Sequence, residues 1–287
     1  MSEKIDIPCK SGVNAAFFNQ TLTLSDKKFA LVTGACSGIG LAFSRELAGY
    51  GYSLLLISND EKRLTEAAEK IKIDFTVDVI ILCIDLSLED SAQKIFNFCE
   101  ENNIILEVII NNAGIFFFRD IVNVRPELIE TKINLHVKTP VMLCRLFAGK
   151  MIQEKRKGFI LNMASISGWM MMPGIALYSS TKSLIRCFSR AMRHEILDKG
   201  ISITTVCPGA VATGLYNLSS RYMELGVKLA IIMTPEKLAK KALKKMFRRK
   251  KEYIPNAFLN RFFIFIVNIM PDVLVRRLKK KIDALYQ

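Results

Sequence analysis

Apolar segments of strand length recur along the chain, and each is followed by a longer segment in which apolar residues have a helical spacing. Most positions in these segments are hydrophobic, without the regular alternation of a half-exposed strand, which is typical of strands buried on both faces of a parallel sheet. They predict strands at Phe29–Val32, Tyr52–Ile57, Val79–Ile84, Val108–Ile110, Phe159–Met163 and Ile201–Val206. The segments between them predict helices at Ile39–Ala48, Glu61–Ile71, Glu89–Glu101, Pro126–Ile152 and Ala176–Leu197.

Strands that alternate with helices in this way predict an α/β fold. Right-handed crossovers would build a Rossmann-type, doubly wound parallel sheet with helices on both faces. A chain of 287 residues is long enough for one such domain. We place this single domain at residues 28–255, with an N-terminal arm at 1–27 that fits no regular element and a basic and apolar C-terminal extension at 256–287.

A glycine-rich loop joins the first predicted strand to the first predicted helix. It reads Thr33-Gly34-Ala35-Cys36-Ser37-Gly38-Ile39-Gly40. Gly34 would allow a tight turn, Gly38 would let the backbone approach a pyrophosphate, and Gly40 would let the helix pack closely on the strand. Glycines in a turn can be purely structural, but strand, loop and helix occur here in the order that dinucleotide binding requires.

The residues after the second predicted strand bear on which dinucleotide is bound. An acidic residue that binds a ribose 2′-hydroxyl is expected about twenty residues beyond the loop. Ser58 stands at that position and Asn59 follows it, so neither a repelling carboxylate nor a phosphate-binding arginine is present there. Lys62 or Arg63 could supply the positive charge, or both could be solvated residues of a helix. We expect NADP(H) in preference to NAD(H).

Tyr178 and Lys182 are four residues apart in a predicted helix, so their side chains lie on one face. An ammonium group beside a tyrosine favours the phenolate, which suits a general acid/base for carbonyl reduction. The spacing alone is common by chance. Ser165 adds a hydroxyl just past the fifth predicted strand, at the sheet edge where parallel sheets bind ligands.

With these residues the chain resembles the short-chain dehydrogenase/reductase family over about residues 28–255. The other matching positions are Asp85, Asn111-Asn112-Ala113-Gly114, Asn134 and Pro208-Gly209-x-x-x-Thr213. The resemblance implies hydride transfer between NAD(P) and a carbonyl/alcohol pair. Cys36 replaces the more usual serine of the glycine loop, a small-for-small change, and the arginine expected after the second strand is absent.

The resemblance also implies a role for each matching residue. Tyr178 would protonate the carbonyl oxygen, Ser165 would hydrogen-bond that oxygen, and Lys182 would bind the nicotinamide ribose. Asn134 would hold a water molecule in the proton relay. Further cofactor contacts would come from Asp85 and Leu86 at the adenine, from Asn112, Ala113 and Gly114 along the cofactor, and from Pro208, Gly209, Val211 and Thr213 around the nicotinamide carboxamide.

Several of these residues have a simpler interpretation. Asn111 and Asn112 could mainly tie neighbouring strands together, and Asp85 could simply end its strand. Ser167 is a rival to Ser165, although its spacing to the following glycine does not match the family pattern.

The remaining motifs concern metals and substrate. His136 and His194 have no Cys or carboxylate cluster at metal spacing, so we interpret both as structural and expect no metal. Trp169–Met172 could be packing or could line a substrate pocket. The segment at about 214–233 has the position of the family's mobile lid. Its apolar side chains would suit a hydrophobic ketone such as a 3-oxoacyl thioester, a steroid or another lipid.

Positive charge is concentrated at the C-terminus. Residues 237–287 hold fifteen Lys and Arg against three Asp and Glu, a net of +12 in a chain of net charge +14. An amphipathic helix with a basic face is expected from Pro235 onwards. Phe262–Met270 is far shorter than the roughly twenty apolar residues of a bilayer span.

This C-terminal segment could pack on the domain, closing the substrate pocket or a subunit interface. It could also rest peripherally on an anionic membrane surface. We do not expect nucleic acid as a partner, because the lysines come without a recognised reading motif.

Seven scattered cysteines without a Cys-x-x-Cys pair argue against a disulfide framework or zinc site and suit a reducing compartment. No secretory signal is visible, so we expect a cytoplasmic protein. Many members of the resembled family form a homodimer or homotetramer through the two long helices, and we expect the same here. A non-catalytic dinucleotide-binding sensor or scaffold is the alternative to an enzyme, and the presence of Ser165, Tyr178 and Lys182 favours the enzyme.

Overall fold

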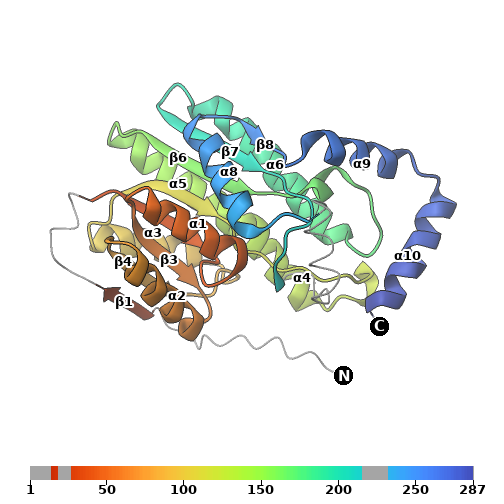
Figure 1. Cartoon of the computed structure of the whole chain (residues 1–287), viewed down its shortest axis with the longest axis horizontal. Helices are drawn as coiled ribbons and strands as arrows, with labels where there is room; N and C mark the ends of the chain where they lie inside the picture. The colour runs from red at the N-terminus through yellow and green to blue at the C-terminus, as the bar shows by residue number, and fades with distance from the viewer. Residues whose placement is uncertain (1–13, 19–26, 215–231, 287) are drawn as a thin grey trace.

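The computed structural model describes residues 14–18, 27–214 and 232–286, and an eight-stranded sheet forms its centre (Figure 1). The strand order is β1-β4-β3-β2-β5-β6-β7-β8. Strands β2 to β8 run parallel, and β1 pairs with β4 in the antiparallel sense. The strands are β1 (Asn14–Phe18), β2 (Phe29–Thr33), β3 (Ser53–Ser58), β4 (Val79–Cys83), β5 (Leu106–Asn111), β6 (Gly158–Met163), β7 (Ile201–Val206) and β8 (Glu252–Tyr253).

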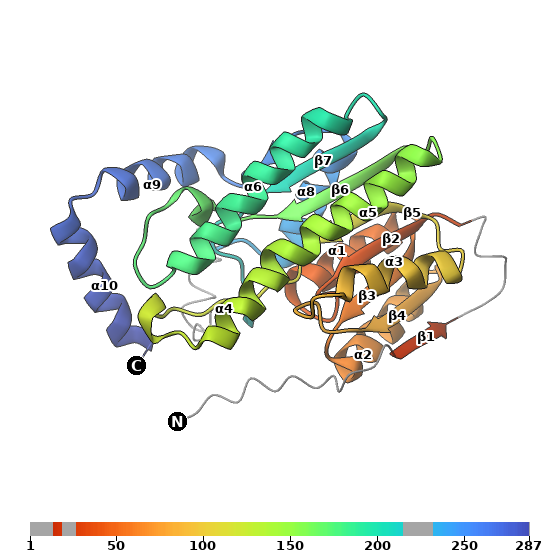
Figure 2. The same ribbon diagram turned by 180° about the vertical axis from the view of Figure 1, so that it is seen from behind.

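Helices cover both faces of the sheet, which confirms the predicted doubly wound α/β fold. On one face lie α1 (Gly38–Gly49), α2 (Glu61–Asp74) and α8 (Pro235–Phe247), which are in front in Figure 1. On the other lie α3 (Ser91–Glu101), α5 (Thr139–Gln153) and α6 (Ala176–Ile196), which are in front in Figure 2. At the C-terminus, α9 (Ala257–Ile269) and α10 (Asp272–Tyr286) stand to one side of the sheet.

Strand β3 shows why the strands are mostly apolar. Leu54 and Leu56 belong to the hydrophobic core under α1, α2 and α8, whereas Leu55 and Ile57 belong to the core under α3, α5 and α6. Successive side chains of a strand point to opposite faces, so a strand covered on both faces is apolar at successive positions rather than at every second one. The mostly hydrophobic segments in the sequence are the direct consequence.

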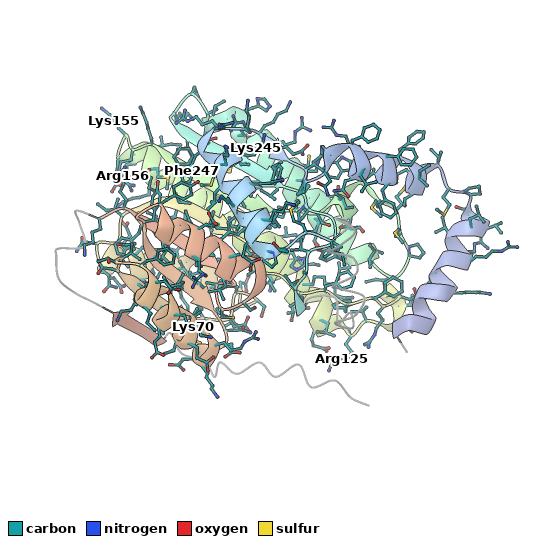
Figure 3. The ribbon with its side chains drawn as sticks, in the orientation of Figure 1. Lys70, Arg125, Lys155, Arg156, Lys245 and Phe247 are labelled. Atoms are coloured by element: carbon teal, nitrogen blue, oxygen red, sulfur yellow. The ribbon has the colours of Figure 1, made fainter. Side chains whose placement is uncertain are left out.

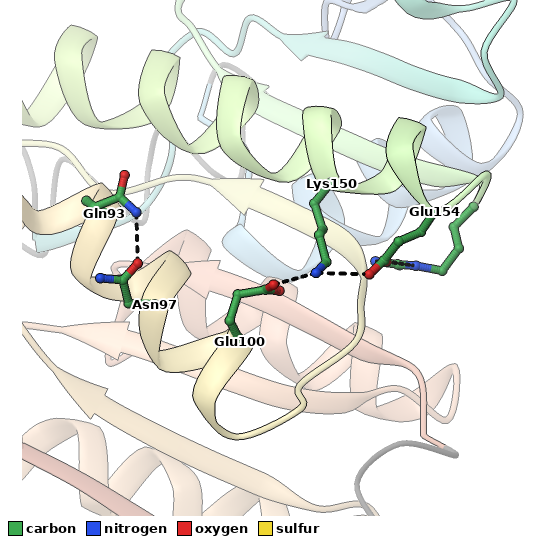
Figure 4. Close-up of polar contacts among 6 residues, drawn as sticks. Gln93, Asn97, Glu100, Lys150 and Glu154 are labelled. Atoms are coloured by element: carbon green, nitrogen blue, oxygen red, sulfur yellow. Dashed lines mark hydrogen bonds and ion pairs between the residues drawn. The ribbon is translucent and has the colours of Figure 1, made fainter.

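Polar contacts between neighbouring helices lie on the surface of this framework (Figure 4). Lys150 of α5 forms ion pairs with Glu100 of α3 and, at 3.0 Å, with Glu154, the residue that follows α5. The amide of Gln93 donates to Asn97 at 2.8 Å along α3. Such exposed pairs contribute about 0–1 kcal/mol each. The two apolar cores therefore hold the layers together.

Helix α8 confirms the amphipathic helix predicted from Pro235. The Thr234 side chain accepts a hydrogen bond from the backbone of Lys237 and caps the helix, while the apolar side is buried against the sheet. Phe247 closes its end, with ring centroids 5.2 Å from Tyr50 and 5.3 Å from Phe159 (Figure 3).

The structure departs from the sequence prediction in three places. Strand β1 lies inside the segment 1–27, for which no regular element was predicted, so that prediction is wrong for residues 14–18. The helix predicted at 126–152 is α4 (Pro126–Ile133) and α5, joined by a π-helical turn, η3 (Asn134–Lys138). Strand β8 is only two residues long and leaves no pattern in the sequence.

Candidate active site

A cavity of about 790 Å³ opens at the carboxyl ends of the parallel strands. Parallel α/β sheets bind their ligands at this edge, and the volume lies within the range of small-molecule and cofactor sites. The predicted site residues that line it are Gly34, Cys36, Ser37, Gly38, Ile39, Ser58, Asn59, Asp85, Leu86, Asn112, Ala113, Gly114, Ser165, Tyr178, Lys182, Pro208, Val211 and Thr213. Three predicted residues, Gly40, Asn134 and Gly209, are not part of the lining.

The glycine loop has the backbone geometry that its sequence predicts. Gly34 and Gly38 have φ values of +65° and +51°, in the left-handed region that favours glycine. A Cβ at Gly40 would lie 2.0 Å from the carbonyl oxygen of Gly34, so only glycine lets α1 approach β2 this closely. Gly40 thus allows α1 to pack closely on the glycine loop and does not itself line the cavity.

Thr33, a residue with no predicted role beyond its place in the loop motif, fixes the loop to the end of β5. Its hydroxyl oxygen accepts hydrogen bonds from the backbone N–H groups of Asn112 at 2.9 Å and Ala113 at 3.0 Å. The Asn112 side chain donates in return to the Thr33 carbonyl at 3.0 Å. Asn111 donates to Asn162 of β6 at 2.8 Å. Both asparagines therefore tie neighbouring strands together, and Asn112 also lines the cavity.

One end of the cavity contains the side chains that bear on cofactor choice. The Ser58 hydroxyl lies 3.1 Å from the Cys36 thiol. Asp60 caps α2 by accepting from the backbone N–H of Arg63 at 3.0 Å. Arg63 lines the cavity, whereas Lys62 does not, and the Arg63 guanidinium is only loosely paired with Asp60 at 3.9 Å.

Asp85 both ends a strand segment and faces the cavity. One of its carboxylate oxygens accepts from the backbone and hydroxyl of Ser87, at 2.8 and 2.7 Å. These bonds form the turn after β4, as the simpler interpretation predicted, and the residue also lines the cavity.

Ser165, Tyr178 and Lys182 meet in the cavity from two elements. Ser165 caps the short helix η4 (Ile166–Trp169), with its hydroxyl oxygen accepting from the Ser167 backbone at 3.1 Å. Lys182 donates to the Met163 carbonyl at 2.9 Å, and its ammonium lies 5.8 Å from the centre of the Tyr178 ring. Burial lowers the pKa of Lys182 to about 8. Ser167 does not line the cavity, which favours Ser165 over its rival.

Asn134 occupies the first position of the π-helical turn. Its side chain donates to the Ser87 carbonyl at 2.9 Å, and its own carbonyl accepts from the Thr139 backbone five residues on. The Asn134 side chain thus bonds to the turn after β4. Its predicted role, to hold a water molecule in the proton relay, stays a prediction.

His136 links the segment that follows β5 to helix α6, and the sequence analysis did not predict this role. Its Nε2 accepts from the Ile115 backbone at 2.9 Å, and its Nδ1 lies 3.1 Å from the Thr181 hydroxyl. Thr181 in turn donates to the Tyr178 carbonyl at 2.9 Å. Burial, with Lys182 and Lys132 nearby, holds the pKa of His136 well below its usual value. His136 also lines the cavity, and its two hydrogen bonds fit the structural role predicted for it.

Lys132 of α4 was also missed. Its side chain is fully buried, and its Nζ has no hydrogen-bond partner among the described residues. The nitrogen lies 3.3 Å from the centre of the Phe117 ring and 5.6 Å from that of Tyr178. Burial, and secondarily Lys182, lowers the pKa of Lys132 to about 7.

Other predictions have mixed outcomes. Trp169–Met172 does not line the cavity; Met170 packs with Ile166 and Val267, so the packing interpretation holds for it. The lid predicted at about 214–233 lies mostly outside the described residues. Within the described part of the chain, no group of three or more His, Cys, Asp or Glu residues is placed to hold a metal.

Comparison with known proteins gives consistent matches. The model of the family described as short chain dehydrogenase matches residues 28–224. A very-long-chain 3-oxoacyl-CoA reductase from Danio rerio is 33% identical over 81% of this chain and 73% of its own. A 17-beta-hydroxysteroid dehydrogenase type 3 from Danio rerio is 32% identical over 66% of this chain and 62% of its own. Across six 3-oxoacyl-CoA reductases, the matched part spans 59–73% of their length.

Solved structures show the same fold. A short-chain dehydrogenase from Sphingobium yanoikuyae in complex with NADPH aligns with a TM-score of 0.71 and 26% identity. The alignment covers 86% of this chain and 97% of that protein.

Proposed function

The chain belongs to the short-chain dehydrogenase family and is an oxidoreductase of CH–OH and C=O groups, and from this premise we propose that it is an NADPH-linked reductase of a hydrophobic ketone. The observation that carries the proposal is that Ser165, Tyr178 and Lys182 line one cavity together with the glycine loop. The proposed proton donor and the proposed dinucleotide site would thereby share one cavity.

The residues present fit a nicotinamide dinucleotide. The left-handed glycines bring the backbone to the cavity at the N-terminus of α1, where free N–H groups suit a pyrophosphate. Pro208, Val211 and Thr213 would border the nicotinamide end. When bound, the reduced cofactor supplies a hydride. Gly209 stays a predicted contact, although it is not part of the lining.

The chain's own residues would supply the proton and the orientation. Ser165 would donate a hydrogen bond to the substrate carbonyl oxygen and fix its position. Tyr178 would transfer its phenolic proton to that oxygen, giving the secondary alcohol. Lys182, held by the Met163 carbonyl, would bind the nicotinamide ribose and favour the phenolate that remains. Asn134, at the start of the π-helical turn, would hold a water molecule in the proton relay.

Three features favour NADP(H) over NAD(H). Ser58 presents no carboxylate against a 2′-phosphate, and Arg63 offers a guanidinium at the same end of the cavity. Guanidinium groups bind phosphates in a bidentate manner. The related enzyme from Sphingobium yanoikuyae has NADPH bound.

For the substrate we propose a lipid-like ketone, in first place a 3-oxoacyl thioester. The relatives' names support this class, and a steroid ketone is the second candidate because of the hydroxysteroid dehydrogenase among them. We further propose a cytoplasmic homodimer or homotetramer. Every cysteine in the described residues is free, which suits a reducing compartment.

A substrate panel with NADPH and NADH tests the proposal. We expect ketone-dependent loss of NADPH absorbance, abolished in Tyr178→Phe, with cofactor affinity changed by less than about threefold because Phe keeps the ring packing. Undiminished turnover in Tyr178→Phe would overturn the assignment of the proton donor. Cofactor binding without turnover of any ketone or alcohol would instead support a dinucleotide-binding sensor.

A further inference from the structure

Exposed apolar side chains gather on the two C-terminal helices. The described residues include 18 large hydrophobic side chains that are exposed, and nine of them lie on α9 and α10. These nine are Phe258, Leu259, Phe262, Phe263, Phe265, Ile266, Ile269, Val273 and Leu274. Phe258 alone is 90% exposed. Exposed apolar side chains gathered in this number on two neighbouring helices mark an interaction surface.

The same surface is basic. Residues 257–286 carry six Lys and Arg against two Asp and no Glu. Among the described side chains, Arg261 projects from α9 and Arg276, Arg277 and Lys280 are exposed on α10. Apolar side chains beside cations match the two layers of an anionic bilayer, acyl chains and headgroups. A second copy of this chain would instead bring like charges together.

The inner side of α9 ties this surface to the active site. Val267 packs on Ile166, the residue directly after Ser165, and on Met170, at the end of η4. Asn268 donates to the Trp169 carbonyl at 2.9 Å. Whatever contacts the outer side of α9 therefore lies close to the segment that carries the Ser165 hydroxyl.

Helix α10 extends the surface towards a second exposed apolar segment. Lys279 forms an ion pair with Asp120 at 2.8 Å. The next two residues, Ile121 and Val122, are 43% and 86% exposed. Figures 1 and 2 show α9 and α10 standing off the sheet on this side, and side chains stand out from both helices in Figure 3.

We infer that α9 and α10 dock on an anionic lipid bilayer and that this docking brings the Ser165 side of the active site to the membrane surface. At about 1.5 Å per residue, the 13 residues of α9 span about 20 Å. No described helix combines the length and apolar character of a membrane crossing, so α9 lies in the interface. Access to lipid substrates from the bilayer is a consequence that rests on the proposed function, whereas the docking itself does not.

The test is co-sedimentation of the full chain with vesicles of phosphatidylcholine, with or without phosphatidylglycerol. We expect binding to the anionic vesicles. Binding should weaken by at least about tenfold in Arg276→Glu/Arg277→Glu, since each basic residue near an anionic surface contributes about 1 kcal/mol. A similar loss is expected in Phe262→Ser/Phe265→Ser. All four side chains are exposed, so the fold should persist, which circular dichroism checks.

Lys240→Glu/Lys241→Glu on α8 is the matched control, because these lysines are exposed and equally basic but lie on another helix. Its binding should stay within about threefold of the unmodified chain, because the docking helices keep their charge. An equal loss in this control, or no binding of the unmodified chain, overturns the docking. Light scattering that shows a dimer dissociated by the Phe changes would assign the patch to a second copy and also overturn it.

Turnover of a short, water-soluble ketone separates the two proposals. It should be unchanged in all three variants, because none of the changed residues lines the cavity. Vesicle binding without any turnover would support membrane docking and contradict the proposed reductase function. Turnover without vesicle binding would support the reductase function and contradict membrane docking.

Discussion

The ammonium nitrogen of Lys132 lies 5.6 Å from the centre of the Tyr178 ring and forms no hydrogen bond with the described residues. Lys182 approaches the same ring to 5.8 Å from α6. Two buried cations thus flank the proposed proton donor from different helices. Burying a cation without a hydrogen-bond acceptor costs free energy, so Lys132 should lower the free energy of unfolding by a measurable amount.

Lys132→Met should stabilise the protein at and below neutral pH. The pKa of Lys132 is lowered to about 7 in the native state against an ordinary 10.5, so between these values the unfolded chain binds more protons. The stability contributed by this residue is therefore lowest below pH 7 and rises as the pH approaches 10.5. We expect the variant to gain about 1–3 kcal/mol at pH 7 and below.

Urea unfolding at several pH values measures this effect. The gain should shrink towards pH 10.5. Lys240→Met, at an exposed position of α8, is the control and should show no such pH dependence. A Lys132→Met variant that is less stable than the unmodified chain below pH 7 would contradict the prediction.

Replacing His136 with Ala should destabilise the protein and reduce its sensitivity to acid. The change leaves the Ile115 N–H without its acceptor, at a cost of about 1–3 kcal/mol. The native pKa of His136 is held well below 6.5, so the unfolded chain binds an extra proton as the pH falls through 6.5 and stability drops there. Unfolding followed on both sides of pH 6.5 should show a smaller acid loss in the variant, while His194→Ala, at an exposed site, should behave like the unmodified chain.

Gly40→Ala should abolish cofactor binding or folding. The added methyl group would lie 2.0 Å from the Gly34 carbonyl oxygen, so α1 and the glycine loop must separate. Gly149→Ala is the matched control, since that helical glycine has open space around it and should gain about 0.5–1 kcal/mol. Thermal unfolding and NADPH titration distinguish the two, and wild-type NADPH affinity in Gly40→Ala would refute the packing argument.

Arg63→Ala should weaken NADPH binding by about tenfold or more and leave NADH nearly unchanged. A charge-assisted hydrogen bond to the 2′-phosphate contributes about 1.5–3 kcal/mol, and NADH has no phosphate there. Fluorescence titration with both cofactors measures the ratio. Lys62→Ala should not alter it, because Lys62 does not line the cavity. Equal losses of affinity for both cofactors in Arg63→Ala would contradict a contact with the 2′-phosphate and would show that Arg63 affects binding only by stabilising α2.

Short-range patterns made much of this molecule predictable. Every residue of β3 is buried, and the four consecutive apolar residues at its centre, Leu54–Ile57, predicted a strand covered on both faces. The glycines before α1 and the four-residue spacing of Tyr178 and Lys182 encode a turn and a helix face, which are properties of neighbouring residues.

The remaining features depend on distant contacts. The burial of Lys132 arises because α4 packs near Phe117 and Tyr178, and a lysine beside polar helix neighbours looks solvated in the sequence. The π-helical turn at Asn134 likewise has no distinct composition, because it differs from an α-helix only by one extra residue in its hydrogen-bonded ring. Strand β1 pairs with a strand 61 to 69 residues away along the chain, from Phe18 opposite Val79 to Asn14 opposite Cys83.

By pairing with β4, strand β1 covers what would otherwise be an exposed edge of the sheet. Without it, β4 would present a row of unpaired N–H and C=O groups along the outer edge of an apolar strand, which is a template for self-association. A version of the protein that begins at residue 27 would keep every group of the cavity and still expose this border. We expect such a truncated enzyme to be lost through aggregation rather than through any defect in its chemistry.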